Sequence, residues 1–168
     1  MINLLNNKNF NQQTAYIIVH PDNYAINMSK IIKSADQYKI NLIKKIQHLL
    51  NNNTLVIVLN LEKNCYNLPD FLKKYQEKVI LIPSLNGDMI STQSDKLKKI
   101  LYNIKSIKNI IFTGGWKNAC LKHTISKTIV WPSKIQTIDC IDQPIKVKIN
   151  LESKNKYVLF KLDHEFIF

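Results

Sequence analysis

The stretch that decides the fold is Ile107-Lys-Asn-Ile-Ile-Phe-Thr-Gly-Gly-Trp-Lys-Asn-Ala-Cys-Leu-Lys-His-Thr-Ile-Ser-Lys127. Its short apolar run, Asn109 to Thr113, is typical of a strand buried on both faces, as in a parallel sheet. Gly114 and Gly115 follow, and glycine allows the backbone angles that a sharp turn needs. A helix is expected to begin between Trp116 and Asn118. The pattern therefore predicts a turn at the carboxyl edge of a sheet, where open α/β folds bind ligands.

Apolar runs and helical periodicity alternate through the chain up to residue 141. Further buried strands are predicted at Thr14 to His20, Thr54 to Asn60, Lys78 to Ile82 and Ile135 to Ile141. Helices are predicted at Asp36 to Leu50, Phe71 to Gln76 and Asp95 to Ile104, the last with Ser94 as its N-cap. Strands that alternate with helices indicate right-handed crossovers and a parallel sheet.

The last part of the chain has a different pattern. Apolar residues from Ile145 to Leu151 alternate with Lys146, Lys148 and Asn150, which is the period of a half-buried strand. A second apolar run follows at 157–162, so residues 145–163 are predicted to form an antiparallel hairpin at the sheet edge.

Together these patterns predict a single α/β domain over residues 14–168. The predicted fold class is a doubly wound, mostly parallel sheet with helices on both faces, of the Rossmann-like kind, with a C-terminal antiparallel hairpin. Residues 1–13 are Asn-rich, and we expect them to form a loose N-terminal arm.

The chain is strongly basic. Its 168 residues include 24 lysines and no arginine, and the net charge is +12. This balance favours binding to nucleic acid or another polyanion. It is also typical of a genome rich in Lys, Asn and Ile codons, with lysines on solvated helix faces. Because base readout and bidentate phosphate contacts favour arginine, nucleic acid is the less favoured partner.

No targeting or cofactor signal is evident. No apolar run approaches the roughly 20 residues of a membrane span, and Met1 to Gln13 lacks a signal core. Three cysteines do not suggest a disulfide scaffold. Cys120 and His123 are half of a zinc site at best, and Gly114-Gly115 lacks the dinucleotide and Walker patterns. We therefore expect a cytoplasmic protein with no metal and no cofactor.

Two motifs resemble the isochorismatase-like cysteine hydrolases. Ala15-Tyr16-Ile17-Ile18-Val19-His20 is similar to that family's opening strand, and Gly114-Gly115-Trp116-Lys117-Asn118-Ala119-Cys120-Leu121 is similar to its Gly-x-x-Thr-x-x-Cys-Val turn. The resemblance covers about residues 13–141. It implies a cysteine that attacks a carbonyl or nitrile carbon, an Asp that acts as base, and a Lys that helps polarise the site. It also implies that the protein could self-associate.

The chain departs from that family at two of the three catalytic positions. His20 stands where the family has its Asp, and Asn86 to Asp88 contains no lysine where the family's Lys should fall. The Thr of the cysteine turn is replaced by Lys117. Of the catalytic groups only Cys120 matches. The resemblance therefore implies a degenerate member of the family.

The preferred interpretation is a non-catalytic domain that binds a small ligand or a protein partner in the crevice. The binding residues would be Gly114, Gly115, Trp116, Lys117 and Asn118. Trp116 could form a wall of this crevice, or it could be a packing residue.

The alternative is an active hydrolase of a small amide or ester. Cys120 would be the nucleophile, with the backbone N–H groups around Lys117 to Cys120 as an oxyanion hole. His20 or Asp22 would assist as the base, with Asp22 orienting His20. Against this, Cys120 could be a small buried apolar side chain, and His20 a residue satisfied by a backbone carbonyl.

Overall fold

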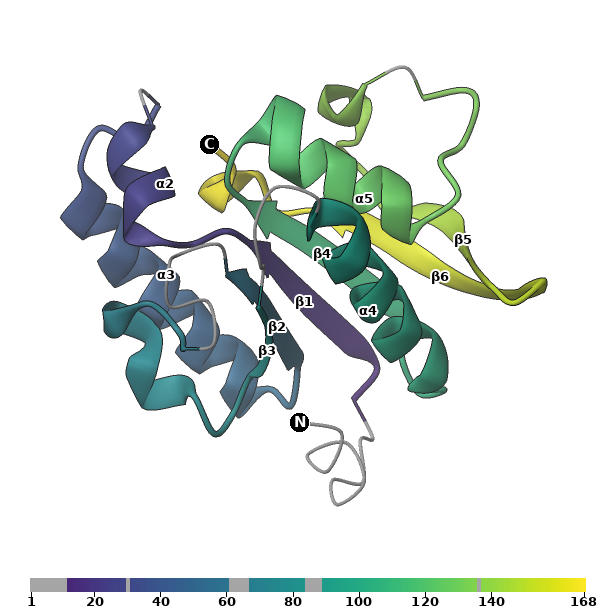
Figure 1. Ribbon diagram of the computed structural model, residues 1–168, viewed down its shortest axis with the longest axis horizontal. Coiled ribbons are helices and arrows are strands. Elements are labelled where there is room, and N and C mark those ends of the chain that lie inside the picture. The colour runs from purple at the N-terminus through teal and green to yellow at the C-terminus, as the bar shows by residue number, and fades with distance from the viewer. Residues whose placement is uncertain (1–11, 30, 61–66, 84–88, 136) are drawn as a thin grey trace.

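A mostly parallel six-stranded sheet forms the centre of the molecule (Figure 1). The computed structural model describes residues 12–29, 31–60, 67–83, 89–135 and 137–168. The strand order is β3-β2-β1-β4-β6-β5. All neighbours pair parallel except β5 and β6, which pair antiparallel. The strands are β1 (Thr14–Val19), β2 (Leu55–Asn60), β3 (Ile80–Pro83), β4 (Asn109–Gly114), β5 (Ile145–Leu151) and β6 (Lys154–Leu162). The predicted α/β class is confirmed.

Four α-helices and four short helical turns accompany the sheet in the described residues. The α-helices are α2 (Asn23–Met28), α3 (Ala35–Asn51), α4 (Met89–Asn103) and α5 (Lys122–Thr128). The short turns are η1 (Asp70–Tyr75), η2 (Lys117–Leu121), η3 (Ile138–Cys140) and η4 (His164–Phe166).

The central strands are buried on both faces. Along β1, Ala15, Ile17 and Val19 belong to the cluster that α4 and α5 complete. Tyr16 and Ile18 belong to a second cluster with α3 and η1. Because successive strand residues point to opposite faces, these two clusters lie on opposite sides of the sheet. Helices on both sides explain why the strand needs an unbroken apolar run.

The hairpin strands are buried on one face only. Val158, Phe160 and Leu162 of β6 are buried in the cluster under α4 and α5, whereas the alternate residues Tyr157 and Leu159 are exposed. In Figure 1, α3 lies beside β1 and β2, at the other end of the sheet from β5 and β6. Because the described helices pack on only one face of this hairpin, apolar and polar residues alternate along its strands.

The chain after β6 folds back and ends beside Gly114 and Gly115. Tyr16 Oη donates a hydrogen bond of 2.8 Å to Asp163 Oδ2, and Lys45 Nζ lies 2.8 Å from the same oxygen. Burial alone would raise the pKa of Asp163, but the hydrogen bonds from Lys45 and Tyr16 lower it below its ordinary value. Tyr38 Oη also donates to the Phe166 carbonyl at 3.0 Å. The last residues are therefore a fixed part of the domain.

Two predictions about secondary structure are wrong. The described residues between 135 and 141 form no strand; Ile138 and Ile141 are buried, and the first begins the 3₁₀ turn η3. A spacing of three between buried residues suits a 3₁₀ turn and not a strand. Ser94 is not an N-cap, because α4 begins at Met89 and Ser94 is fully buried inside it.

The predicted loose arm falls mainly outside the described residues. Its last residue, Gln13, accepts hydrogen bonds through its carbonyl from the N–H groups of Lys108 and Asn109, at 2.8 and 3.0 Å. The chain is therefore held to β4 from residue 13 onward.

Candidate functional site at the carboxyl edge of the sheet

Gly114 makes the close approach of β4 to β1 possible. Its φ is +111°, a conformation that L side chains rarely adopt, and a Cβ there would run into the Val19 backbone carbonyl. The Gly115 N–H donates to the same carbonyl at 2.7 Å. Trp116 then adopts a left-handed φ of 47°. These three residues turn the chain sharply from β4 into η2.

The cysteine turn is a π-type turn, not the start of a regular α-helix. The Leu121 N–H donates to the Trp116 carbonyl, five residues earlier, at 3.2 Å. The Lys117 N–H donates to the Phe168 carbonyl at 2.8 Å, and the Ala119 N–H donates to Trp116 at 2.9 Å. These two amides already have acceptors, so they are not free to form the oxyanion hole of the hydrolase interpretation.

Cys120 lies in this turn as a buried thiol. It is 8% exposed. Burial raises its pKa, and the Asp22 carboxylate raises it further, although its own backbone N–H acts in the opposite direction. A raised pKa keeps sulfur in the thiol form at neutral pH, and the thiolate is the nucleophile. The site therefore lacks the lowered thiol pKa that activates most catalytic cysteines.

His20 follows β1 and is completely buried. Its backbone is left-handed, with a φ of 50°, and its N–H donates to the Leu59 carbonyl at 2.8 Å. Neither ring nitrogen has a hydrogen-bond partner, so the interpretation of a ring satisfied by a backbone carbonyl is wrong. Burial lowers the pKa of His20 to about 4, and the Gln93 side chain, which approaches the ring without meeting hydrogen-bond geometry, acts in the opposite direction. The imidazole is therefore neutral at pH 7.

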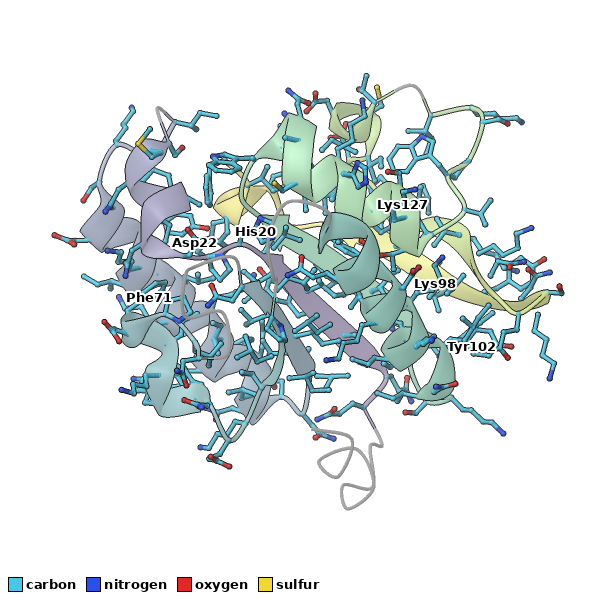
Figure 2. All side chains as sticks on the ribbon, in the orientation of Figure 1. His20, Asp22, Phe71, Lys98, Tyr102 and Lys127 are labelled. Carbon is cyan, nitrogen blue, oxygen red and sulfur yellow. The ribbon has the colours of Figure 1, made fainter. Side chains whose placement is uncertain are left out.

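Asp22 does not orient His20. Its Oδ1 accepts a hydrogen bond of 2.7 Å from the Ala25 N–H and caps the first turn of α2. Figure 2 shows His20 and Asp22 where the chain passes from β1 into α2. Because both imidazole nitrogens are unpaired, the predicted His20–Asp22 pair is absent. Asp22 acts on the site through its charge, which reaches Cys120.

Other buried polar side chains, on β2, α4 and α5, also have unpaired atoms. Asn60 ends β2; its Nδ2 donates to the Asn67 carbonyl at 2.7 Å, and its Oδ1 has no partner. Gln93 Nε2 lies 3.5 Å from the Ile82 carbonyl, and its Oε1 has no partner. Ser94 and Thr124 contribute buried hydroxyls without partners. With His20, we call these four residues the crevice group.

Most members of the crevice group could not be predicted from the sequence. Asn60 could have been predicted, because it is a polar residue directly after an apolar run, at the carboxyl end of a strand. Gln93 and Ser94 lie in a polar segment that resembles a loop and an N-cap, so their burial could not be anticipated. Thr124 lies four residues after Cys120, on the same helical side. The loop tip Asn86 to Asp88, where the family Lys was sought, lies outside the described residues.

Two of the predicted ligand-binding residues, Lys117 and Trp116, contact different parts of the chain. Lys117 Nζ forms an ion pair with Asp139 of η3. Trp116 packs against Phe168, Ala25 and Ile26, in a cluster that joins the cysteine turn to α2.

The C-terminal residue Phe168 lies directly beside the glycine turn. A Cβ on Gly115 would meet the ring of Phe168 at 2.7 Å. The tail is therefore one side of the candidate site, which the sequence did not predict. Asn118 lies on the same turn, in η2.

Within the described ranges, no group of three or more His, Cys, Asp or Glu side chains could hold a metal ion. No helix in that part of the chain is long and apolar enough to cross a bilayer. No protein-family model matches the sequence, and neither a curated protein nor a solved structure matches it. The resemblance to isochorismatase-like hydrolases therefore stays a prediction.

Proposed function

We propose that this chain is a catalytically degenerate, isochorismatase-like domain that binds a small, uncharged polar ligand at the carboxyl ends of its strands. The observation that carries this proposal is His20, a completely buried imidazole with both nitrogens unpaired. It lies at the edge of a mostly parallel sheet, where open α/β folds bind ligands. The finer fold assignment, a doubly wound Rossmann-like sheet, is part of the proposal and is supported by helices packed on both faces.

Unpaired buried polar groups are costly, which is why a group of them indicates a missing partner. Leaving one buried donor or acceptor unsatisfied costs about 1–3 kcal/mol. Native proteins keep such atoms rare, and each one calls for an explanation. A ligand that supplies both donors and acceptors to the crevice group would remove that cost.

The charges around the crevice favour a neutral ligand. The His20 imidazole is neutral at pH 7 because burial lowers its pKa to about 4. Asp22 brings negative charge, and the nearby Lys117 is paired with Asp139. An anionic ligand would therefore meet repulsion without a compensating cation from these residues. A carboxamide, which has a donor and an acceptor and no charge, fits better.

The binding test compares amides with their matching acids. Acetamide and benzamide are added at millimolar concentration, with acetate and benzoate as controls, while the ¹⁵N-labelled histidine ring signals are recorded by NMR. We expect the amides to move the His20 ring signals and the acids to leave them unchanged. In His20→Asn, which lacks this ring, binding is followed through the backbone amide signals. Binding that persists in that variant, or acids that bind as well as amides, would overturn the assignment of the crevice.

The catalytic alternative is tested by the reactivity of its cysteine. The rate of iodoacetamide alkylation is measured against pH for each cysteine by peptide mass mapping. We expect Cys120 to react more slowly than the exposed Cys140, because burial and Asp22 raise the pKa of Cys120. If Cys120 reacts faster, with an apparent pKa of 7 or below, the active hydrolase replaces the degenerate domain.

A further inference from the structure

The hairpin has an exposed face of mixed basic and apolar character. The pairing places Lys146 opposite Leu159 and Lys148 opposite Tyr157. Residues opposite each other in an antiparallel pair project to the same side of the sheet. Lys161 is two residues beyond Leu159, so it projects to that side as well. We call these five residues the hairpin face.

Large apolar side chains are exposed at the centre of the hairpin face. Tyr157 is 60% exposed and Leu159 is 45% exposed. On the opposite side of β6, Val158 and Phe160 are buried under α4 and α5. The core therefore does not need the Tyr157 and Leu159 side chains, and their placement on a solvated face calls for another explanation.

The charge on these strands has one sign. The strand sequences IKVKINL and KNKYVLFKL contain lysines and no acidic residue. Lys146 Nζ lies 5.3 Å from the centre of the Tyr157 ring. Lys156 is not part of this face, because its Nζ donates to the carbonyls of Leu101 and Ile104 at the end of α4, both at 2.6 Å. Three lysines therefore surround one exposed aromatic ring and one exposed leucine.

We propose that the hairpin face binds single-stranded nucleic acid without sequence preference. A base would stack on Tyr157 and contact Leu159, while Lys146, Lys148 and Lys161 neutralise neighbouring phosphates. Residues two apart on a strand are separated by about 7 Å, so Lys146 and Lys148 can contact different phosphates. Sheet faces that combine stacking aromatics with basic residues suit single strands, whose bases are free to stack.

The composition of the face favours a single strand over other anionic partners. A duplex presents phosphates but keeps its bases stacked, so Tyr157 and Leu159 would have no partner. The chain contains no arginine, and arginine provides the commonest base-specific contact. Binding is therefore expected to depend on charge and stacking and not on sequence. This site is separate from the crevice and independent of the proposed small ligand.

The experiment measures binding of a fluorescein-labelled oligothymidylate of 12 nucleotides by fluorescence anisotropy at several salt concentrations. Tyr157→Ala removes the stacking ring, and we expect about a tenfold loss of affinity. Tyr157→Phe keeps the ring and should bind as the unchanged protein does. Changing Lys146, Lys148 and Lys161 together to Gln should lower the slope of log K against log salt by about 2.

A matched triple variant separates a specific face from net charge. Lys73, Lys99 and Lys127 are exposed on η1, α4 and α5, and changing these three to Gln removes the same charge. We expect this control to bind nearly as the unchanged protein does. Equal losses for both triple variants, or no loss in Tyr157→Ala, would overturn the proposal. Binding to anionic phospholipid vesicles without binding to the oligonucleotide would also overturn it.

Discussion

The central strands and the hairpin strands belong to one sheet, yet they meet different surroundings. All six residues of β2 are buried, whereas along β6 buried and exposed residues alternate. Helices on both sides of β1 and β2 bury every side chain of these two strands except that of Thr14. Within the described residues, helices cover the β5–β6 hairpin on one side, and its other side carries lysines and an exposed tyrosine.

This difference separates two kinds of candidate site. In the central part, buried strand ends put neutral polar atoms such as those of His20 where water is scarce, so hydrogen bonds are strong and unpaired groups are costly. On the hairpin face, solvent surrounds charged side chains, so long-range attraction and stacking act there. The first surface suits a small neutral ligand, and the second suits a flexible polyanion. Four sets of variants test this contrast, beginning with the largest expected effect.

Gly114→Ala should be the most damaging change in the central part. The methyl group would meet the Val19 carbonyl, and the φ of +111° is unfavourable for alanine. We expect a loss of about 4 kcal/mol or more in the free energy of unfolding, or failure to fold. Gly115→Ala is the control, because its methyl group meets the end of the Phe168 ring and approaches the His20 carbonyl less closely, at 3.2 Å, and it should cost about 1–3 kcal/mol. Urea denaturation gives both values, and equal effects would contradict the close β1–β4 approach.

The two faces of β6 are compared directly by Phe160→Ala and Tyr157→Ala. Phe160 is completely buried, and its ring centre lies 5.9 Å from that of Phe112. Truncating a buried phenylalanine costs about 3–5 kcal/mol. Truncating the exposed Tyr157 should cost about 0.5 kcal/mol. Thermal and urea unfolding measure both changes. A large loss in Tyr157→Ala would mean that the hairpin face is covered and is no docking surface.

His20 should make the protein less stable in acid. Its pKa is about 4 when folded, against 6.5 for the ordinary group. Between these values the unfolded chain binds more protons, so stability falls as pH falls from about 6.5 towards 4. The expected loss is about 3 kcal/mol.

The control for this pH effect is an exposed histidine. His20→Asn should flatten the dependence of unfolding free energy on pH, and Asn tolerates the left-handed backbone there. His123→Asn, at an exposed position of α5, should leave the dependence as it is. If the two variants behave alike in urea titrations at pH 4.5 and 7, the imidazole of His20 is not buried in its neutral form.

Lys156→Met should have the smallest effect of the four. Lys156 Nζ donates to two carbonyls at the C-terminal end of α4 and so connects the hairpin to that helix. Methionine keeps the apolar stem but loses the donors, so we expect a loss of about 1–2 kcal/mol. Lys154→Met, on an exposed position of the same strand, is the control and should be nearly neutral. The comparison is made by thermal unfolding at pH 7.

The strands of the central sheet could be found from sequence to within one or two residues. The predicted 14–20, 54–60 and 109–113 correspond to β1, β2 and β4, because strands covered on both faces require continuous apolar runs. The long helix α3 was found by its period for a similar reason. The apolar pattern of a segment depends on whether one or both of its faces are buried, and this pattern can be read directly from the sequence.

The candidate site was less predictable, because its properties depend on neighbours that are distant in sequence. Cys120 and His20 were found by position, but the burial that raises one pKa and lowers the other comes from the packed chain around them. Asp22 was expected to orient His20, yet it caps α2. Phe168 reaches the glycine turn only because β6 returns beside β4.

The sequence by itself determined the α/β class, the central strands and the glycine turn before Cys120. Periodicity and backbone freedom are local properties, so they can be observed without the fold. Only the tertiary structure decided which polar atoms lie buried without partners and which side of the hairpin faces solvent. Both depend on what packs against a residue, and that is set by strand order and long-range pairing.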